Sequence, residues 1–410
     1  MFDTCDIILE NGIRLITIKK ETQLASVHVG FNIGALYEMN DKKGIAHFVE
    51  HMLFKGTKNR DNEVLNYELE CLGGEYNAYT DYKCTVYSTT TLNEELNKSL
   101  DLLADLTINS IFPRKQLEKE RGVIISEVKS GKDDLEELSF NRINNMAFLK
   151  SPLKCDVIGK EKHINDMSKE DLVEFYNKYY VPNNCYISIV SNYDHEYIRT
   201  LIDNYFGNWK SKEVKRPIVE FEKNICKKEV TYKKEIEQST VLYLYSFNNL
   251  TKDEELALRV LNHKFGESSN SILFRELRED RGLAYDVYTT LDLSEGLKTL
   301  YIYTSIAEEN VEETLETIDK CIKDITEEKI IFDDETIEIM KKVFKTAVAS
   351  TMEDVTDLGN YVLHQAMEGE HIYEFIEEME KLSDVTKKDL YKVARKVLKD
   401  PTIHILLRDE

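Results

Sequence analysis

The sequence lacks the excess of basic residues that is typical of proteins that bind nucleic acids or anionic membranes. Lysine and arginine number 54 against 76 aspartate and glutamate residues, so the formal net charge is −22. Proteins bind nucleic acids and anionic membranes through basic surface patches, so we expect neither as a partner. With 42% hydrophobic and 32% charged residues, the 410-residue composition is that of a folded protein. Its length corresponds to about two to four domains.

Long apolar segments and disulfide patterns are also missing. The longest run without a charged residue, 179–193, contains Pro182 and reads as a loop followed by a strand. The first residues lack the basic region and apolar core of a signal peptide. The seven cysteines are odd in number and scattered, with no Cys-x-x-Cys pair. We therefore expect no membrane span, and free, mostly buried thiols in a cytoplasmic protein.

Hydrophobic periodicity predicts a mixed order of strands and helices in the first half. Residues 6–10 and 13–18 flank Asn11-Gly12, a dipeptide that favours a hairpin turn. In the strand predicted at 25–36, apolar residues alternate with Ser26, His28, Gly30 and Asn32, which predicts one buried and one polar face. The remaining predictions are helices at 44–54, 62–71, 94–110 and 114–129, and strands at 75–80, 85–91 and 183–190.

The order of elements recurs after a charged stretch that carries Pro217. Beyond it we predict a strand at 239–247, helices at 253–265 and 273–281, and a strand at 284–291. The repeat of about 210 residues is too long for a solenoid and indicates two duplicated α+β domains. We place an N-terminal domain at 1–212, a linker at 213–230 and a C-terminal domain at 231–410.

The motif His47-Phe-Val-Glu50-His51 lies in the first predicted helix. Positions i and i+4 lie on one face of a helix, so the two imidazoles could share a metal ion. Glu50 projects at the edge of that face, where it could take a proton from a metal-bound water. This is the inverted form of the His-Glu-x-x-His zinc motif. The alternative is an ordinary helix with two surface or core histidines.

A catalytic zinc ion usually has three protein ligands and leaves the fourth position to water. The third ligand must come from elsewhere in the chain. Glu120 and Glu127 lie seven residues apart, two turns along one face of the helix predicted at 114–129. Spacing alone leaves both open as ligands or as solvated surface charges.

The run from His47 to Thr57 resembles the signature of the pitrilysin, insulinase and mitochondrial processing peptidase family of zinc endopeptidases. In that family the third ligand is a glutamate about 76 residues after the second histidine. The segment Glu120-Arg-Gly-Val-Ile-Ile-Ser-Glu127 is similar to the corresponding stretch. The resemblance implies one Zn²⁺ per subunit, held by His47, His51 and Glu127, with Glu50 as the base. It implies Glu120 as a supporting acid beside the ligands.

Two further segments resemble the same family. Residues 73–80, Gly-Gly-Glu-Tyr-Asn-Ala-Tyr-Thr, are similar to its edge strand for substrate, which implies Gly74, Asn77, Ala78 and Thr80 as substrate-binding residues. The segment Leu277 to Tyr285 resembles the part of its C-terminal domain whose arginine and tyrosine hold the scissile carbonyl, here Arg278 and Tyr285. Without the resemblance, these residues would be an ordinary strand, a surface arginine and a packed tyrosine.

The chain also departs from the family pattern. It reads Ser271-Ile-Leu where the family commonly has Ser-Arg-Leu, and the helix predicted at 253–265 carries only His263 and no metal motif. The second domain is therefore expected to keep the fold without the metal. The other histidines have no partner at ligand spacing, and we interpret them as structural or surface residues; they are His28, His163, His195, His364, His371 and His404.

The resemblance implies a fold in which each domain is a mostly antiparallel sheet with helices packed on it, and the two form half of a clamshell. It implies a zinc endopeptidase that cleaves peptides or unfolded segments in a chamber completed by a second subunit, which we expect to be a second copy. A catalytic subunit with a degenerate partner and a non-catalytic assembly subunit remain alternatives. If part of the acidic excess lines the chamber, basic peptides are the favoured substrates.

Overall fold

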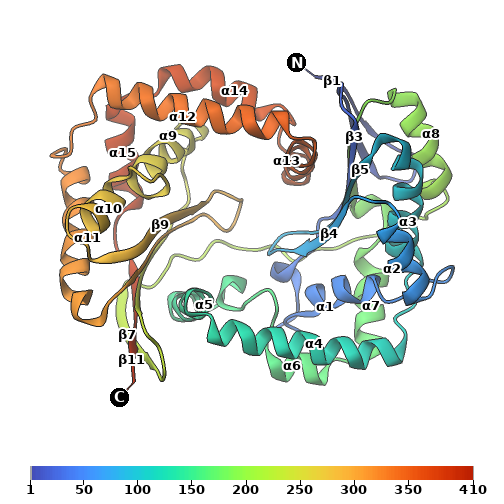
Figure 1. Ribbon diagram of the computed structural model, residues 1–410, viewed down its shortest axis with the longest axis horizontal. Helices are drawn as coiled ribbons and strands as arrows, with labels where there is room; N and C mark the ends of the chain where they lie inside the picture. The colour runs from blue at the N-terminus through green and yellow to red at the C-terminus, as the bar shows by residue number, and fades with distance from the viewer. Residues whose placement is uncertain (1, 410) are drawn as a thin grey trace. The chain divides into compact units, whose positions relative to one another are not determined.

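The computed structural model describes residues 2–409, which divide into two compact units (Figure 1). The first unit consists of residues 2–130, 155–218 and 349–374. The second consists of residues 131–154, 219–348 and 375–409. Each unit contains one β-sheet with helices packed on it, which confirms the predicted α+β fold.

The sheet of the first unit has six strands and is mostly antiparallel. Only the pairing of β2 with β6 is parallel. From edge to edge the strands are β1 (Asp3–Ile8), β2 (Arg14–Lys19), β6 (Cys185–Ser191), β3 (Leu24–Phe31), β5 (Thr85–Leu92) and β4 (Glu75–Thr80). The strand predicted at 75–80 therefore lies at an edge of the sheet.

Most helices of the first unit bury apolar residues against one face of this sheet. Phe48 and Met52 of α1 join Val27 and Phe31 of β3 in a single core, and none of these four side chains is accessible to solvent. The helices of the first unit, including α13 on the other face, are α1 (Ile45–Leu53), α2 (Asn62–Glu70), α3 (Leu96–Asn109), most of α4 (Arg114–Asp133), α6 (Glu161–Asp166), α7 (Lys169–Tyr179), α8 (His195–Phe206) and α13 (Val355–Glu368).

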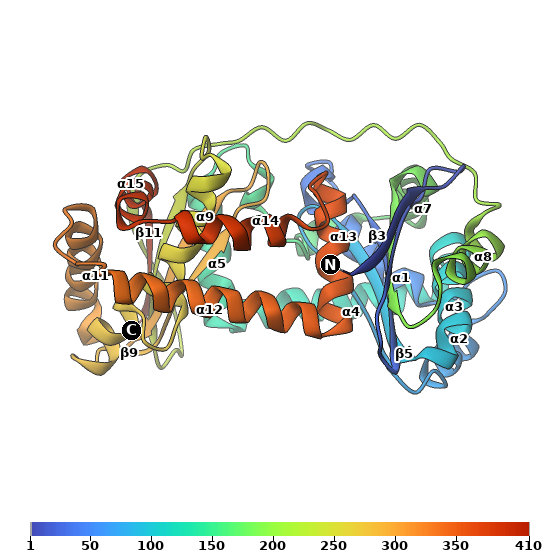
Figure 2. The same ribbon diagram turned by 90° about the horizontal axis from the view of Figure 1, so that it is seen from above.

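The other face of the sheet is covered by α13, which lies beside β3 and β6 (Figure 2). The Ser188 hydroxyl donates to the Gly359 carbonyl oxygen at 2.7 Å. Gly359 permits this approach, since a Cβ there would lie 2.9 Å from Cδ2 of His28. Ser26 and His28, predicted on a polar face, are consequently buried. The sequence correctly predicted a polar face, but not that α13, from a distant part of the chain, covers it.

His28 is expected to make the packing of α13 sensitive to acid. Burial lowers its pKa from 6.5 to about 4, with a smaller contribution from His364. The unfolded chain therefore takes up this proton near pH 6.5, whereas the folded chain resists it. Its stabilising contribution is complete above pH 6.5 and falls by about 3 kcal/mol as the pH approaches 4. The protection factors of residues 355–368, which are corrected for the slower intrinsic exchange of amides at low pH, should fall over this range. His28→Gln should remove most of that fall; an equal fall in the variant would contradict the prediction.

The sheet of the second unit has five strands and is also mostly antiparallel, with β7 and β11 as its one parallel pair. From edge to edge the strands are β7 (Lys227–Lys233), β11 (Thr402–Arg408), β8 (Ser239–Ser246), β10 (Thr299–Ile306) and β9 (Ala284–Asp292). The helices are α5 (Leu135–Ala147), α9 (Lys252–Asn262), α10 (Ile272–Phe274), α11 (Val311–Thr326), most of α12 (Asp334–Glu353), most of α14 (Glu374–Lys381) and α15 (Lys387–Val397).

Helix α5 packs on β8 and β11 although it comes from the first half of the chain. Its Ser139 hydroxyl lies 2.6 Å from that of Thr240, and Asn144 accepts a hydrogen bond from the Tyr301 hydroxyl at 2.7 Å. Each sheet is thus covered by one helix from the opposite half of the sequence, α5 for the second and α13 for the first.

The exchanged helices and β7 depart from the domain limits expected from the sequence. The limits 1–212 and 231–410 place α5 and α13 each with the wrong sheet, because their packing partners lie far away in the sequence. The expected linker at 213–230 is without regular structure up to residue 226, but residues 227–230 begin β7. These residues look like linker because they are charged, and they form a strand because β11 pairs with their backbone.

Two further expectations concern membrane-spanning helices and the cysteines. Among residues 2–409, no helix combines the length and apolar character needed to cross a bilayer. All seven cysteines are free thiols, as expected. They are not mostly buried, however, since only Cys84, Cys185 and Cys321 are; two others are half-buried and two are exposed.

Candidate metal centre

Helix α1 carries the inverted motif and is fixed at its first turn by a buried carboxylate. Gly44 precedes the helix with a φ of 95°, a conformation that favours glycine. Both oxygens of Glu38 accept backbone N–H bonds, from Gly44 at 3.0 Å and Ala46 at 2.9 Å. A carboxylate at a helix N-terminus satisfies free N–H groups and complements the helix dipole. The motif therefore begins from a fixed position.

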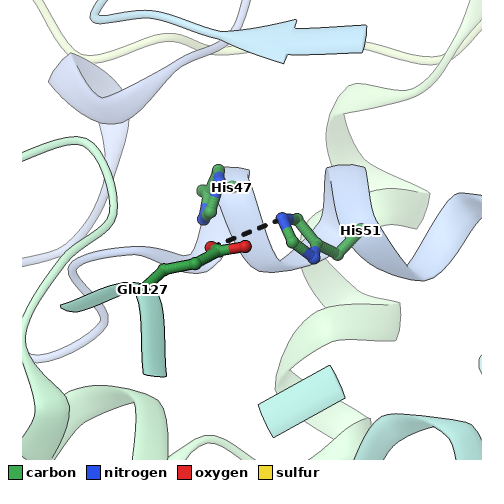
Figure 3. A group of neighbouring side chains, drawn as sticks. All are labelled: His47, His51 and Glu127. Carbon is green, nitrogen blue, oxygen red and sulfur yellow. Dashed lines mark ion pairs between the residues drawn. The ribbon is translucent and has the colours of Figure 1, made fainter. Parts of the chain in front are cut away.

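His47, His51 and Glu127 converge, as Figure 3 shows. One ligand atom of each lies within 4.8 Å of the other two. The two imidazoles come from successive turns of α1, with ring centroids 4.6 Å apart, and Glu127 comes from α4. Its Oε2 atom lies 3.8 Å from Nε2 of His51. All three side chains are half-buried.

The second nitrogen of His51 faces another acid of α4. Nδ1 of His51 lies 3.3 Å from Oε2 of Glu120, while Nε2 faces Glu127. The other oxygen of Glu120 is 3.0 Å from Nζ of Lys55. A carboxylate that holds the far nitrogen of a histidine fixes its tautomer and orientation. Glu120 thus lies where a supporting acid is expected, and Lys55 is a further member that we did not predict.

Glu50 lies beside this group and is almost completely buried. Burial raises the pKa of its carboxyl, and Glu127 adds to this, whereas a hydrogen bond from Thr80 and the charge of His51 oppose it. The Thr80 hydroxyl donates to Oε2 of Glu50 at 2.6 Å. Burial, followed by the nearby His51, lowers the pKa of His47 to about 3, so this imidazole is neutral at ordinary pH. A neutral imidazole is the form that binds a metal.

Removing the Thr80 hydroxyl is expected to raise the pKa of Glu50 further, because the charged form loses its hydrogen bond. In a Thr80→Val variant the Glu50 carboxyl should therefore ionise at a higher pH than in wild type. The measurement is an NMR titration of the Glu50 carboxyl carbon, made on the variant and the wild type in parallel. An unmoved titration would show that Thr80 does not control this ionisation.

The other residues assigned to the edge strand stay predictions as substrate contacts. Asn77, Ala78 and Thr80 lie on β4, the edge strand of the first sheet. Gly74 precedes it, and a Cβ there would lie 2.2 Å from the Thr90 carbonyl oxygen, which no other residue could tolerate without a backbone shift. The Thr80 side chain donates a hydrogen bond to Glu50, and the expected contact of its backbone with substrate stays a prediction.

Arg278 and Tyr285 lie together in the second unit. The Arg278 guanidinium is 4.9 Å from the ring centroid of Phe274 and 5.9 Å from that of Tyr285. Both side chains are exposed, Tyr285 by 74%. They form a paired cation and phenol on one surface. Within the described part of the second unit, no three potential ligands gather as they do around His47.

The donor set of the first group fits zinc. Two imidazoles and one carboxylate, from a helix and a neighbouring helix, are the ligands of a hydrolytic zinc site with one open position. A buried acid, Glu50, lies beside the group, and among the described residues no sulfur ligand joins it. We therefore consider the group a candidate catalytic zinc centre.

Comparisons with known proteins identify the family. The model described as Insulinase (Peptidase family M16) matches residues 14–161, and that described as Peptidase M16 inactive domain matches residues 166–344. An uncharacterized zinc protease of Rickettsia felis is 30% identical over 333 residues, which cover 79% of each chain. The chain belongs to peptidase family M16. A second M16 relative, the mitochondrial-processing peptidase subunit beta of Caenorhabditis elegans, is 28% identical over 76% of this chain and 69% of its own.

Solved structures share the M16 fold over the whole chain. A protease from Helicobacter pylori has a TM-score of 0.91 and 22% identity and covers 99% of this chain and 100% of its own. The structure described as peptidase M16 inactive domain from Pseudomonas fluorescens also has a TM-score of 0.91, with 16% identity and coverage of 100% and 98%. At these identities the likeness concerns the fold alone.

The sequence predicted the candidate ligands, but it did not predict the roles of Lys55 and Glu38 or the contact of Thr80 with Glu50. Lys55 follows His51 by four residues, a helical spacing that could have suggested it. Glu38 carried no signal, since its role is to cap α1 from a preceding loop. The contact of Thr80 with Glu50 depends on the pairing of β4 at the sheet edge, which spacing does not reveal.

Proposed function

We propose that this M16 protein is a zinc-dependent endopeptidase that hydrolyses peptides or extended unfolded segments. The observation that carries the proposal is the convergence of His47, His51 and Glu127 with buried Glu50 at their side. Zinc bound there would polarise the scissile carbonyl and increase the acidity of water. Family membership supports the metal, since the relative from Rickettsia felis is named a zinc protease.

Glu50 is the proposed base and acid of the reaction. Burial raises the pKa of its carboxyl, which makes the carboxylate a stronger base than an exposed glutamate. It takes a proton from the attacking water and then delivers it to the leaving amine. Thr80 holds Oε2 of Glu50 and leaves Oε1 as the oxygen that moves the proton. Glu120 keeps His51 oriented toward the ligand group.

The proposed substrate contacts come from β4 and from the second unit. An edge strand offers unpaired backbone groups, so an extended peptide can add to it through main-chain hydrogen bonds with little dependence on sequence. Arg278 and Tyr285 are proposed to bind the carbonyl oxygen, since a guanidinium and a phenol both donate hydrogen bonds to developing negative charge. The net charge of −22 supports basic peptides as the preferred class.

We propose that the active form is a homodimer, since the candidate ligands and the Arg278–Tyr285 pair occur in one chain. Two alternatives persist. The chain could be the catalytic half of a heterodimer, and the match to a relative named as a subunit favours this over a monomer. A non-catalytic assembly subunit would have no use for a buried base beside three potential ligands. The mass in solution of the purified chain separates homodimer from monomer.

Zinc removal is the direct test of the proposal. The purified chain should contain zinc and cleave an unstructured peptide rich in lysine and arginine. Dialysis against a chelator should abolish cleavage, because the candidate centre has no other source of Lewis acidity, and added Zn²⁺ should restore it.

The same preparation provides the opposing outcomes. Cleavage that persists after zinc is removed would refute a zinc-dependent mechanism. A zinc-loaded homodimer that cleaves no peptide would favour the non-catalytic alternative, whereas cleavage that appears only with a second protein would favour the heterodimer. Equal rates for basic and acidic peptides at low salt would remove the proposed charge preference.

A further inference from the structure

A second group of potential metal ligands lies in the first unit. Asp81 and Cys84 belong to the turn between β4 and β5, and His364 lies on α13. One ligand atom of each lies within 4.8 Å of the other two. Over residues 2–409, this group and that of His47, His51 and Glu127 are the two that meet this criterion. Neither the proposed mechanism nor the family resemblance uses it.

The turn presents one oxygen and the sulfur side by side. Oδ1 of Asp81 accepts the backbone N–H groups of Lys83 and Cys84, both at 2.6 Å. Oδ2 accepts a hydrogen bond from the Cys84 thiol, with the sulfur 3.3 Å away. With Zn–O and Zn–S bonds of about 2.0 and 2.3 Å, tetrahedral geometry places the two ligands about 3.5 Å apart. The observed separation is therefore already close to that of two ligands of one ion.

Tyr79 fixes the ring of His364. The Tyr79 hydroxyl donates to Oδ1 of Asn360 at 2.7 Å, so at 2.7 Å from Nε2 of His364 it can only accept. Nε2 thus carries the hydrogen, and a neutral His364 ring has its lone pair on Nδ1. Metal-binding histidines are commonly held by a hydrogen bond of this kind from the other nitrogen.

We propose that Asp81, Cys84 and His364 form a second zinc-type site, which fastens the β4–β5 turn to α13. Thiolate, imidazole and carboxylate are the donors that zinc accepts, and a soft sulfur ligand disfavours magnesium and calcium. As the metal–sulfur bond forms, the Cys84 proton leaves to solvent, and no oxidation state changes.

The turn and α13 are also joined outside this group. The ion pair between Lys83 and Glu368, 3.1 Å long, already links the turn to α13. The turn directly follows Thr80, which holds Glu50. A metal at the second site would therefore restrain the end of the strand that positions the proposed base, without contacting the base itself.

Cobalt binding separates this site from the candidate catalytic centre. The group of His47, His51 and Glu127 contains no sulfur, so of the two ligand groups among residues 2–409 the second is the one that can give Co²⁺ a thiolate charge-transfer band in the near ultraviolet. The full-length, zinc-depleted chain is titrated with Co²⁺ alone. We expect two equivalents bound and a thiolate band. Cys84→Ser should lose the band and one equivalent, and Glu127→Gln should keep the band.

Two variants complete the test. Cys185→Ser removes another buried thiol, one with no acid or histidine partner in the described structure, and should leave the band unchanged. If Cys84→Ser does not fold, His364→Gln, at a half-buried position, should lower the affinity for the second Co²⁺ ion by at least about tenfold. Absence of the band in wild type, or its persistence in Cys84→Ser, would overturn the proposal. The readout needs no cleavage, so it is independent of the proposed peptidase function.

Discussion

Replacing Glu50 by glutamine is expected to lower kcat for peptide cleavage by about 10²- to 10⁴-fold, the usual contribution of a positioned general base. The amide has nearly the same shape and can still accept the hydrogen bond from Thr80, but it cannot take a proton. Because Glu50 is not among the three converging ligand candidates, zinc content should stay at the wild-type level. Steady-state cleavage and zinc analysis on one preparation measure both quantities.

The control for this variant is another glutamate of the same unit. Glu70 ends α2 on the surface, and Glu70→Gln should leave both kcat and zinc content unchanged. Undiminished cleavage by a zinc-loaded Glu50→Gln variant would refute the proposed role of the base. If the variant instead loses its zinc, the loss of activity says nothing about proton transfer, and the ligand assignment itself is wrong.

Replacing Asp105 by alanine is expected to destabilise the first unit by at least about 3 kcal/mol, as expected when one partner of a buried charge network is removed. Asp105 is 3% exposed and lies on α3. Its oxygens accept hydrogen bonds from Thr57 at 2.7 Å, Arg60 at 2.8 Å and Asn59 at 2.6 Å. Burial alone would raise its pKa, but these bonds outweigh it and keep the pKa below the ordinary value.

The network holds the loop between α1 and α2, so its loss should also loosen the C-terminal end of the helix that carries His47 and His51. Denaturant unfolding of the variant measures the cost. Asp101→Ala is the matched control, since Asp101 binds the same Arg60 at 2.6 Å from a position that is 30% exposed and should cost below about 1 kcal/mol. Equal costs for the two variants would contradict the assigned importance of burial.

Local spacing was sufficient to predict the elements that carry the candidate ligands. His47, Glu50 and His51 lie within one helical turn and a half, and the structure places them on α1 as predicted. Glu127 required the family resemblance, because seven-residue spacing from Glu120 does not show which acid faces the histidines. The structure answers this by geometry, with Glu127 near Nε2 of His51 and Glu120 near Nδ1.

Contacts between distant segments could not be predicted in this way. The hydrogen bond between Tyr79 and His364 spans 285 positions, so the sequence offered no reason to pair that histidine with the β4–β5 turn. The polar face of β3 was predicted from the alternation of apolar and polar residues along the strand. That alternation shows which residues share a face, but not which element packs on it. In both cases α13 supplies the missing partner, and no periodicity in α13 reveals the sheet on which it packs.

The exchange of α5 and α13 has a consequence for synthesis on the ribosome. The first sheet is fully translated by residue 191, but its cover, α13, ends at residue 368. At about 5–20 residues per second, a nascent chain would therefore expose the uncovered face with His28 and Ser188 for roughly 10–35 s. Completion of the first unit waits for most of the second, and a nascent chain interrupted in between would carry an open, partly polar sheet face for chaperones to shield.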